Sequence, residues 1–349
     1  GLKRCGRLLV LSGGYDVDAL IDPYLAGQAA PAEFLRAEDS LDDIPVESID
    51  DLLIFGADAA LLERAFAKLA KGGLVNIVQM GETFGRPVLS PVGRLHYGGL
   101  RMVGTTGANP VDSLAGVPVS GEIREGDRID VVGAGGPMGT MHVIRNVCQG
   151  VPGISVWGGD MSDQRLQALE RLTRPLADAN QVEFSTYNAG THPPEGDFDY
   201  IALMVPAPGL VADAIGRTAP GGIINIFAGI PATVSHELDL DTYIGRGLYF
   251  IGTSGSVIED MRVVLRKVTD QTLDTNLSVA AVSGLDGAVA GIRAVEKQEV
   301  PGKIIVYPAC VGLPLTRLTD LADRHPDVAA HLCDGAWTAD AERALLEQY

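Results

Sequence analysis

Cysteine is scarce in this chain of 349 residues, which carries four: Cys5, Cys148, Cys310 and Cys333. The four form no CxxC pair and show no regular spacing. Disulfide scaffolds and zinc ribbons both depend on such spacing, so the sequence argues against either. We therefore expect a reducing compartment, and the cytoplasm fits best.

Long apolar runs are also lacking. No segment approaches the roughly 20 consecutive apolar residues that a membrane-spanning helix needs. The start of the chain, GLKRCGRLL, has no long apolar core of the kind found in signal peptides. The sequence predicts no membrane partner. Its first residue is Gly rather than Met, which we interpret as a sign of a trimmed or processed chain.

Basic residues are outnumbered by acidic ones. Lys and Arg number 27 against 45 Asp and Glu, which gives a formal net charge of −18. The resulting negative field opposes non-specific attraction to nucleic acid or anionic lipid, and no basic stripe offsets it. We predict no nucleic-acid partner. The apolar content of 46% is enough for a substantial core, and the length allows two domains.

Short apolar runs alternate with helical patterns along the chain. Continuous runs of this length are typical of strands buried on both faces of a parallel sheet, so the predicted class is α/β. The runs are RLLVL, DLLIFG, LVNIVQMG, LRMVG, RIDVVG, ISVWGG, YIALMV, IINIFAG and LYFIGT.

An internal repeat is the decisive feature. KGGLVNIV at 71–78 matches PGGIINIF at 220–227, and GLRMVGTTG at 99–107 matches GLYFIGTSG at 247–255. Earlier in each copy, LLVLSGGYDVDAL aligns with GISVWGGDMSDQRL, and AEFLRAEDS aligns with VEFSTYNAG. One such match is unremarkable because glycine turns after helices are common. Several in the same order at a nearly constant offset predict two Rossmann-like, doubly wound parallel-sheet units in tandem.

The first unit is predicted to be incomplete. It starts at about Arg7 with the counterpart of a second strand, and nothing in it corresponds to 128–150. The first strand lies at the centre of a doubly wound sheet, so its loss leaves unpaired backbone groups there. Three fillers remain open: residues missing from the start, the segment KIIVYP at 303–308, or a rearranged strand order.

Four segments follow from this organisation. We expect a degenerate Rossmann-like unit, a dinucleotide-binding Rossmann domain, a helix and strand extension, and a helical tail. Their boundaries are 1–118, 119–256, 257–310 and 311–349.

The stretch RIDVVGAGGPMGTMH at 128–142 predicts a strand, a glycine turn and a helix that holds a dinucleotide. Its glycines permit a tight turn and a close approach to a pyrophosphate, while the helix start from Pro137 aims free N–H groups at the phosphates. The spacing, GxGGPxG, has one residue more than GxGxxG, and a glycine cluster alone is a weak signal. The predicted phosphate site comprises Gly133, Gly135, Gly136, Pro137, Met138 and Gly139.

Asp160 strengthens this interpretation. It ends the second strand, ISVWGGD, about 20 residues after Gly139, where a carboxylate binds the ribose hydroxyls and repels a 2′-phosphate. The predicted cofactor is therefore NAD rather than NADP. The alternative for Asp160 is a helix N-cap. Arg165 is a candidate to lie over the adenine, with a solvated helical face as its alternative. The first unit has about Gly14 at the position of Asp160, so we expect no dinucleotide there.

The order VVGAGGPMG, GGDMSDQRL, FDYIALMVPAPGLVADAIGRTAPGGIINIFAGI, LYFIGTSGSVIEDMRVVLRKV and VPGKIIVYP resembles the cofactor domain of medium-chain dehydrogenases/reductases, over roughly 120–308. Within that superfamily it is most similar to the sorbitol dehydrogenase and sorbose-1-phosphate reductase branch. The resemblance implies that Val205 and Pro206 contact the adenosine side of the cofactor. It also implies that Phe227, Ala228 and Gly229 lie along the nicotinamide, and that Thr253 and Ser254 lie near its carboxamide.

One departure from the family concerns its N-terminal barrel-like domain, which brings a catalytic zinc through Cys, His and a His-Glu pair. Here only His236 is followed by Glu, in VSHELDL, and we interpret this stretch as a surface loop. His331 and Cys333 are too few to hold zinc. We therefore assign no metal site and no catalytic residue. His142 is interpreted as packing beneath the glycine turn rather than as a proton donor.

The family also suggests how the units sit together. In its dimers, the last strand of each cofactor domain meets the same strand of the partner. LRMVG and LYFIG are those strands, present here in one chain. We therefore expect the two units to pair internally, which covers two sheet edges.

Two functions from different classes follow. The first is an NAD(H)-binding oxidoreductase that transfers hydride between nicotinamide and an alcohol, polyol or sugar-phosphate carbon. Its substrate-side groups would come from an N-terminal catalytic domain missing from this sequence, or from a partner in a homo-oligomer. The second is a catalytically silent NAD-binding or scaffolding protein. An S-adenosylmethionine methyltransferase shares the glycine turn and acidic strand end, but GPMG and GTSG favour a dehydrogenase.

Overall fold

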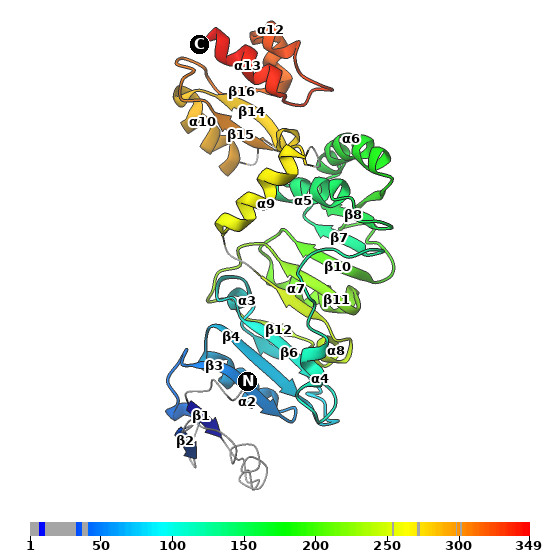
Figure 1. The fold of residues 1–349 in the computed structure, drawn as a ribbon, viewed down its shortest axis with the longest axis vertical. Coiled ribbons are helices and arrows are strands. Elements are labelled where there is room, and N and C mark those ends of the chain that lie inside the picture. Colours follow the sequence, from blue (N-terminus) through cyan, green and yellow to red (C-terminus); the bar gives the residue numbers. More distant parts are fainter. Residues whose placement is uncertain are drawn as a thin grey trace.

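The computed structural model describes residues 7–10 and 33–36 by their backbone only, and residues 41–252, 255–270, 273–297, 299–300 and 302–349 in full. The molecule is elongated, with the first unit at one end, a large sheet in the middle and the C-terminal elements at the other end (Figure 1).

A six-stranded parallel sheet forms the second unit. Its strands lie in the order β13-β11-β10-β7-β8-β9, which is the doubly wound arrangement that the apolar runs predict. Apolar side chains of α5 and α6 cover one face of the sheet and those of α7 and α8 the other. The elements are β7 (Arg128–Val132), α5 (Pro137–Cys148), β8 (Ser155–Asp160), α6 (Asp163–Asn180), β9 (Glu183–Asn188), β10 (Phe198–Leu203), α7 (Pro208–Arg217), β11 (Thr218–Ile226), β12 (His236–Leu238), α8 (Leu240–Gly245) and β13 (Tyr249–Ile251).

The first unit has the same strand order with its centre left out. Strands β6-β4-β3 form one parallel sheet and β1-β2 another. No strand of the described residues lies between them. The segment KIIVYP does not fill the position, so this candidate was wrong: Lys303–Val306 pairs with another sheet. The elements are β1 (Arg7–Val10), β2 (Glu33–Arg36), β3 (Ile49–Phe55), α2 (Ala59–Ala65), β4 (Leu69–Val78), β5 (Val88–Ser90), α3 (Val92–Tyr97), β6 (Arg101–Thr105) and α4 (Asp112–Ala115).

Two short 3-10 helices belong to the first unit and a third precedes the C-terminal sheet. They are η2 (Leu41–Asp43), η3 (Phe66–Lys68) and η4 (Thr275–Ser278).

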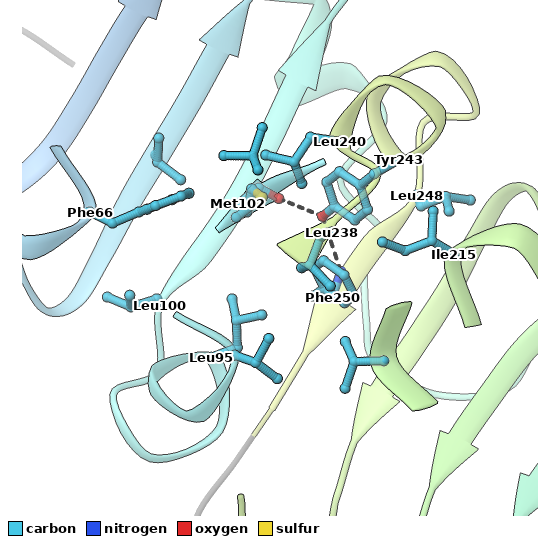
Figure 2. Packing of buried hydrophobic residues seen from close by; sticks show 14 of the residues in the cluster. Phe66, Leu95, Leu100, Met102, Ile215, Leu238, Leu240, Tyr243, Leu248 and Phe250 are labelled. Carbon is cyan, nitrogen blue, oxygen red and sulfur yellow. Dashed lines mark hydrogen bonds between the residues drawn. The ribbon is translucent and has the colours of Figure 1, made fainter. Parts of the chain in front are cut away.

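The two units share a continuous hydrophobic core. Strands β6 and β13 lie side by side at this junction, although they belong to separate sheets. Between them, the buried Tyr243 hydroxyl donates a hydrogen bond to the Met102 carbonyl (2.8 Å) and accepts one from Phe250 N (3.2 Å), as Figure 2 shows. The core includes side chains from both units, such as Phe66, Leu95, Leu100, Ile215, Leu238, Leu240 and Leu248.

An antiparallel pair, β5 with β12, adds a second link between the units. His236 lies opposite Ser90, and Leu238 lies opposite Val88. The interpretation of VSHELDL as a surface loop was therefore wrong, because its His-Glu pair lies in a strand. Three residues are too few to show strand periodicity, and their pairing depends on a segment far away in the sequence.

A C-terminal module follows the second unit. Strand β14 pairs in parallel with β15 and antiparallel with β16, and the tail helices pack on this sheet around the buried Trp337. Thr338 caps the last helix, because its Oγ1 accepts a hydrogen bond from Ala341 N (3.0 Å). The elements are α9 (Ile258–Thr269), β14 (Val279–Ser283), α10 (Leu285–Glu296), β15 (Lys303–Val306), β16 (Thr316–Arg317), η5 (Leu318–Asp320), α11 (Leu321–Arg324), α12 (Pro326–Ala329) and α13 (Ala339–Gln348).

Candidate dinucleotide site

The glycine turn joins β7 to α5 at the carboxyl edge of the six-stranded sheet. Gly133 has a φ of +85°, which favours glycine, and its N–H donates to the Gly159 carbonyl (2.8 Å). A β-carbon built on Gly139 would lie 2.2 Å from the Gly133 carbonyl oxygen. The first turn of α5 thus packs directly against the backbone of the preceding turn, and a side chain at Gly139 would separate them.

The start of α5 offers unpaired amide groups. Gly136 is the N-cap and Pro137, which has no N–H, is the first helical residue. Within the described residues, no acceptor lies in hydrogen-bond geometry with the N–H groups of Met138 and Gly139. Two free amides at the positive end of a 12-residue helix fit an anion such as a pyrophosphate.

Asp160 lies beside this turn, at the end of β8. One carboxylate oxygen accepts a hydrogen bond from Gly135 N (3.1 Å) and the other accepts one from Ser162 N (2.9 Å). Ser162, not Asp160, is the N-cap of α6, and its hydroxyl accepts a hydrogen bond from Arg165 N (3.4 Å). The N-cap alternative for Asp160 is therefore not what the structure shows.

Arg165 belongs to the same cluster. A β-carbon built on Gly135 would lie 2.7 Å from the Asp160 carboxylate and 2.6 Å from the β-carbon of Arg165. The structure thus brings the glycine turn, the acidic strand end and the first turn of α6 together, as the spacing in the sequence predicts.

The loops after β10 and β11 border the turn on its other side. A side chain at Gly133 would collide with Val205, which precedes Pro206 in the loop after β10. Phe227, Ala228 and Gly229 directly follow β11. Thr253 and Ser254 lie outside the described residues.

His142 links α5 to this second set of residues. Its ring stands edge-on to the ring of Phe227, with 4.5 Å between the centroids, and its Nδ1 lies 3.0 Å from the Met138 carbonyl oxygen. Burial lowers the pKa of His142 below its ordinary value. The side chain therefore packs against Phe227, directly after the end of β11.

The corresponding edge of the first unit is filled by Asp241 of α8. Its carboxylate accepts hydrogen bonds from Gln79 Nε2 (2.7 Å), Phe84 N (2.9 Å) and Gly85 N (3.0 Å). These three residues follow β4, which corresponds to β11 in the repeat. This contact could not be predicted from the sequence, because Asp241 lies far from these residues along the chain.

A buried ion pair in the second unit was not predicted from the sequence. The carboxylate of Asp130, in the middle of β7, is fully buried, accepts a hydrogen bond from the Tyr187 hydroxyl (3.0 Å) and pairs with Arg217 (2.5 Å). Burial raises the pKa of Asp130, and the Arg217 guanidinium opposes that rise. The lone Asp within the apolar strand RIDVV was the available signal.

The described residues contain neither a candidate metal cluster nor a candidate membrane-spanning helix. No cluster of three or more His, Cys, Asp or Glu side chains has a geometry that would hold a metal ion. No helix in the same part of the chain is long and apolar enough to span a bilayer.

Comparison with known proteins gives partial matches. No protein-family model matches the chain. It is 32% identical over 154 residues to L-sorbose 1-phosphate reductase of Klebsiella pneumoniae, a match that covers 43% of this chain and 36% of the relative. It is 25% identical over 249 residues to the uncharacterized protein YggP of Escherichia coli, with 65% and 58% covered. Identity to mannitol-1-phosphate 5-dehydrogenase of Aliivibrio fischeri is 25%, with the same shares covered.

Solved structures match about half of the chain at low similarity. Acetophenone reductase from Geotrichum candidum in complex with NAD matches 53% of this chain and 50% of its own, with a TM-score of 0.43 and 15% identity. L-Idonate 5-dehydrogenase from Escherichia coli matches 52% and 50%, with a TM-score of 0.42 and 14% identity. The chain spans between about a third and three fifths of the curated relatives it matches, and it is similar in sequence to sugar-phosphate reductases and dehydrogenases.

Proposed function

We propose that this chain is the NAD(H)-binding part of a medium-chain-type oxidoreductase, which transfers hydride between nicotinamide and an alcohol, polyol or sugar-phosphate carbon. The observation that carries the proposal is the cluster of Asp160, Gly135 and the free amides of Met138 and Gly139 at one sheet edge.

The dinucleotide would lie across this edge. Its pyrophosphate would rest on the α5 amides and its adenosine ribose on the Asp160 carboxylate, with Arg165, Val205 and Pro206 on the adenosine side. The carboxylate would repel a 2′-phosphate, so NAD is preferred to NADP. Bound nicotinamide accepts or donates the hydride, whereas the protein holds and orients it. Phe227, Ala228 and Gly229, with Thr253 and Ser254, would hold that ring.

The substrate class comes from the relatives. L-Sorbose 1-phosphate reductase and mannitol-1-phosphate 5-dehydrogenase are named for sugar-phosphate and polyol-phosphate substrates, which makes a small phosphorylated polyol or ketose the best candidate. The groups that contact this substrate would come from a catalytic domain outside this sequence or from a partner in a homo-oligomer. This proposal is supported by exposed apolar side chains on α9 and α10, which a further domain or partner would bury. They include Met261, Leu265, Val289 and Ile292. The cytoplasm remains the proposed location.

We attribute the two units to an internal duplication. Their strands follow the same order, and the described residues of the first unit hold no counterpart of the central strand β7. The β5 and β12 strands, which correspond in the repeat, pair with each other in antiparallel register, as identical strands do across a two-fold axis. We propose a division of the chain into the segments 1–118, 119–256, 257–310 and 311–349, of which the last two share one sheet through the pairing of β14 with β16.

Titration of the purified chain with NADH, followed by nicotinamide fluorescence, tests the proposal. We expect saturable binding that Asp160→Ala weakens about tenfold, because a hydrogen bond to a charged group is lost. Asp178→Ala, at the far exposed end of α6, is the matched control and should bind as the unchanged chain does. Absence of NADH binding would contradict the proposal, and binding of S-adenosylmethionine instead would favour a methyltransferase. NADH binding by this chain agrees with both the oxidoreductase and the silent scaffold. Turnover of polyols in added zinc, measured with the proposed catalytic domain or partner present, separates the two.

A further inference from the structure

Helix α3 of the first unit packs against the carboxyl edge of the six-stranded sheet, at the end of β11. Gly93 N donates a hydrogen bond to the Val234 carbonyl (3.0 Å), and a β-carbon built on Gly93 would lie 1.9 Å from the Pro231 carbonyl oxygen. The buried His96 places its Nδ1 2.8 Å from the carbonyl oxygen of Ile226, the last residue of β11. These contacts fix α3 at the end of β11, and Figure 1 shows it beside the six-stranded sheet.

Tyr97, the last residue of α3, therefore reaches the loop that follows β11. A β-carbon built on Gly229 would lie 2.7 Å from the Tyr97 hydroxyl. The Tyr97 ring stands perpendicular to the His96 ring, with 4.6 Å between centroids, so it is held on one side by a buried neighbour. The side chain remains 43% exposed and is thus accessible to a ligand at this edge.

The second unit does not present an equivalent tyrosine to the first unit. In the repeat, α3 corresponds to α8, so that Tyr97 corresponds to Gly245 and Gly93 to Asp241. Asp241 fills the edge of the first unit with three hydrogen bonds, and Gly245 presents no side chain. The loop after β11 in the unit with the glycine turn and Asp160 thus faces the Tyr97 hydroxyl of its neighbour. The loop after β4 in the first unit instead binds the Asp241 carboxylate.

We propose that Tyr97 is a cofactor-positioning residue, supplied by the first unit, whose hydroxyl hydrogen-bonds the nicotinamide half of the dinucleotide bound to the second unit. This inference rests on the proposed function. A phenol both donates and accepts hydrogen bonds, and the carboxamide of nicotinamide offers both a carbonyl and an amino group. The degenerate unit would therefore serve the active unit by completing its site.

The test compares two ligands that differ only in the half that Tyr97 contacts. NADH carries the nicotinamide, whereas ADP-ribose carries the pyrophosphate and adenosine without it. Dissociation constants for both are measured by calorimetry or fluorescence on the full chain and on Tyr97→Phe, which keeps the ring and its packing. Tyr349→Phe is the control, since Tyr349 is similarly exposed (45%) and lies at the far end of the molecule.

We expect Tyr97→Phe to weaken NADH about fivefold, as loss of one neutral hydrogen bond does, and to leave ADP-ribose and the thermal midpoint unchanged. An NADH affinity within twofold of the unchanged chain would overturn the inference. So would an equal loss for both ligands, which would indicate a structural role. In either case binding of NADH by the unchanged chain would leave the proposed function standing, whereas failure of that chain to bind NADH or ADP-ribose would refute both.

Discussion

Asp130 and Arg217 form an ion pair inside the second unit, with 2.5 Å between the guanidinium and the carboxylate. The Asp130 carboxylate is fully buried, whereas the Arg217 side chain is 30% exposed. Tyr187 donates the further hydrogen bond that the carboxylate needs, and its ring lies where a side chain at Gly159 would be. The pair therefore connects β7, β9 and α7 around one buried charge.

Removal of the Arg217 guanidinium should lower the free energy of unfolding more than replacement of the Asp130 carboxylate by an amide. Arg217→Leu leaves the buried carboxylate unpaired, and we expect a loss of about 2 to 3 kcal/mol, below the range for fully buried pairs because Arg217 is partly exposed. Asp130→Asn keeps an acceptor for Tyr187 and should cost about 1 kcal/mol. Urea unfolding of both variants gives the free energies. A larger loss for Asp130→Asn would contradict this assignment.

A methyl group at Gly139 should destabilise the turn. The β-carbon of Gly139→Ala would meet backbone atoms of Gly133 and Ala134 at 2.2 and 2.6 Å, so α5 must move away. We expect a loss of about 2 kcal/mol, as overpacked cores show, and weaker NADH binding. The control is Gly216→Ala in α7, where nothing lies within 4 Å of the added carbon and a gain of about 0.5 kcal/mol is expected. Equal thermal midpoints for the two variants would contradict the close packing.

Burial of His142 should make the stability fall in mild acid. The pKa of His142 is lowered in the folded chain, chiefly by burial. At a pH between this lowered pKa and the ordinary value of 6.5, the unfolded chain therefore binds more protons than the folded chain. Stability contributed by the neutral ring is thus complete above about pH 6.5 and is lost as the pH falls through this window. His142→Gln should flatten the slope of the unfolding free energy between pH 7 and 5.5. His192→Gln, on an exposed loop, is the control and should keep it.

Much of the fold was predictable because the parallel strands are buried on both faces. RIDVV, YIAL and IINI are largely apolar runs, and glycine turns separate them from helices, so class and strand order follow from pattern and repeat. The proximity of Gly135 and Asp160 was predictable for the same reason, since Gly135 lies in the turn after β7 and Asp160 ends the adjacent strand β8.

Contacts between the units were not predictable. Strands β5 and β12 have three residues each, and Tyr97 and Asp241 lie far in sequence from the loops that they contact. Only the packing of the two units brings these groups together. An apolar run such as KIIVYP likewise does not specify which sheet it joins, because any buried strand satisfies its side chains.

Tyr243 should couple the two units into one cooperative structure. Its hydroxyl is the shared partner of the Met102 carbonyl in β6 and the Phe250 N–H in β13, both buried. Tyr243→Phe leaves both backbone groups without that partner, and we expect a loss of about 2 kcal/mol. Tyr249→Phe, on the same strand as Phe250 but partly exposed, should cost under about 0.5 kcal/mol. Since the units share one core, the loss should appear in a calorimetric scan as a shift of a transition that includes both units. A shift confined to one of two separate transitions would show that the units unfold independently.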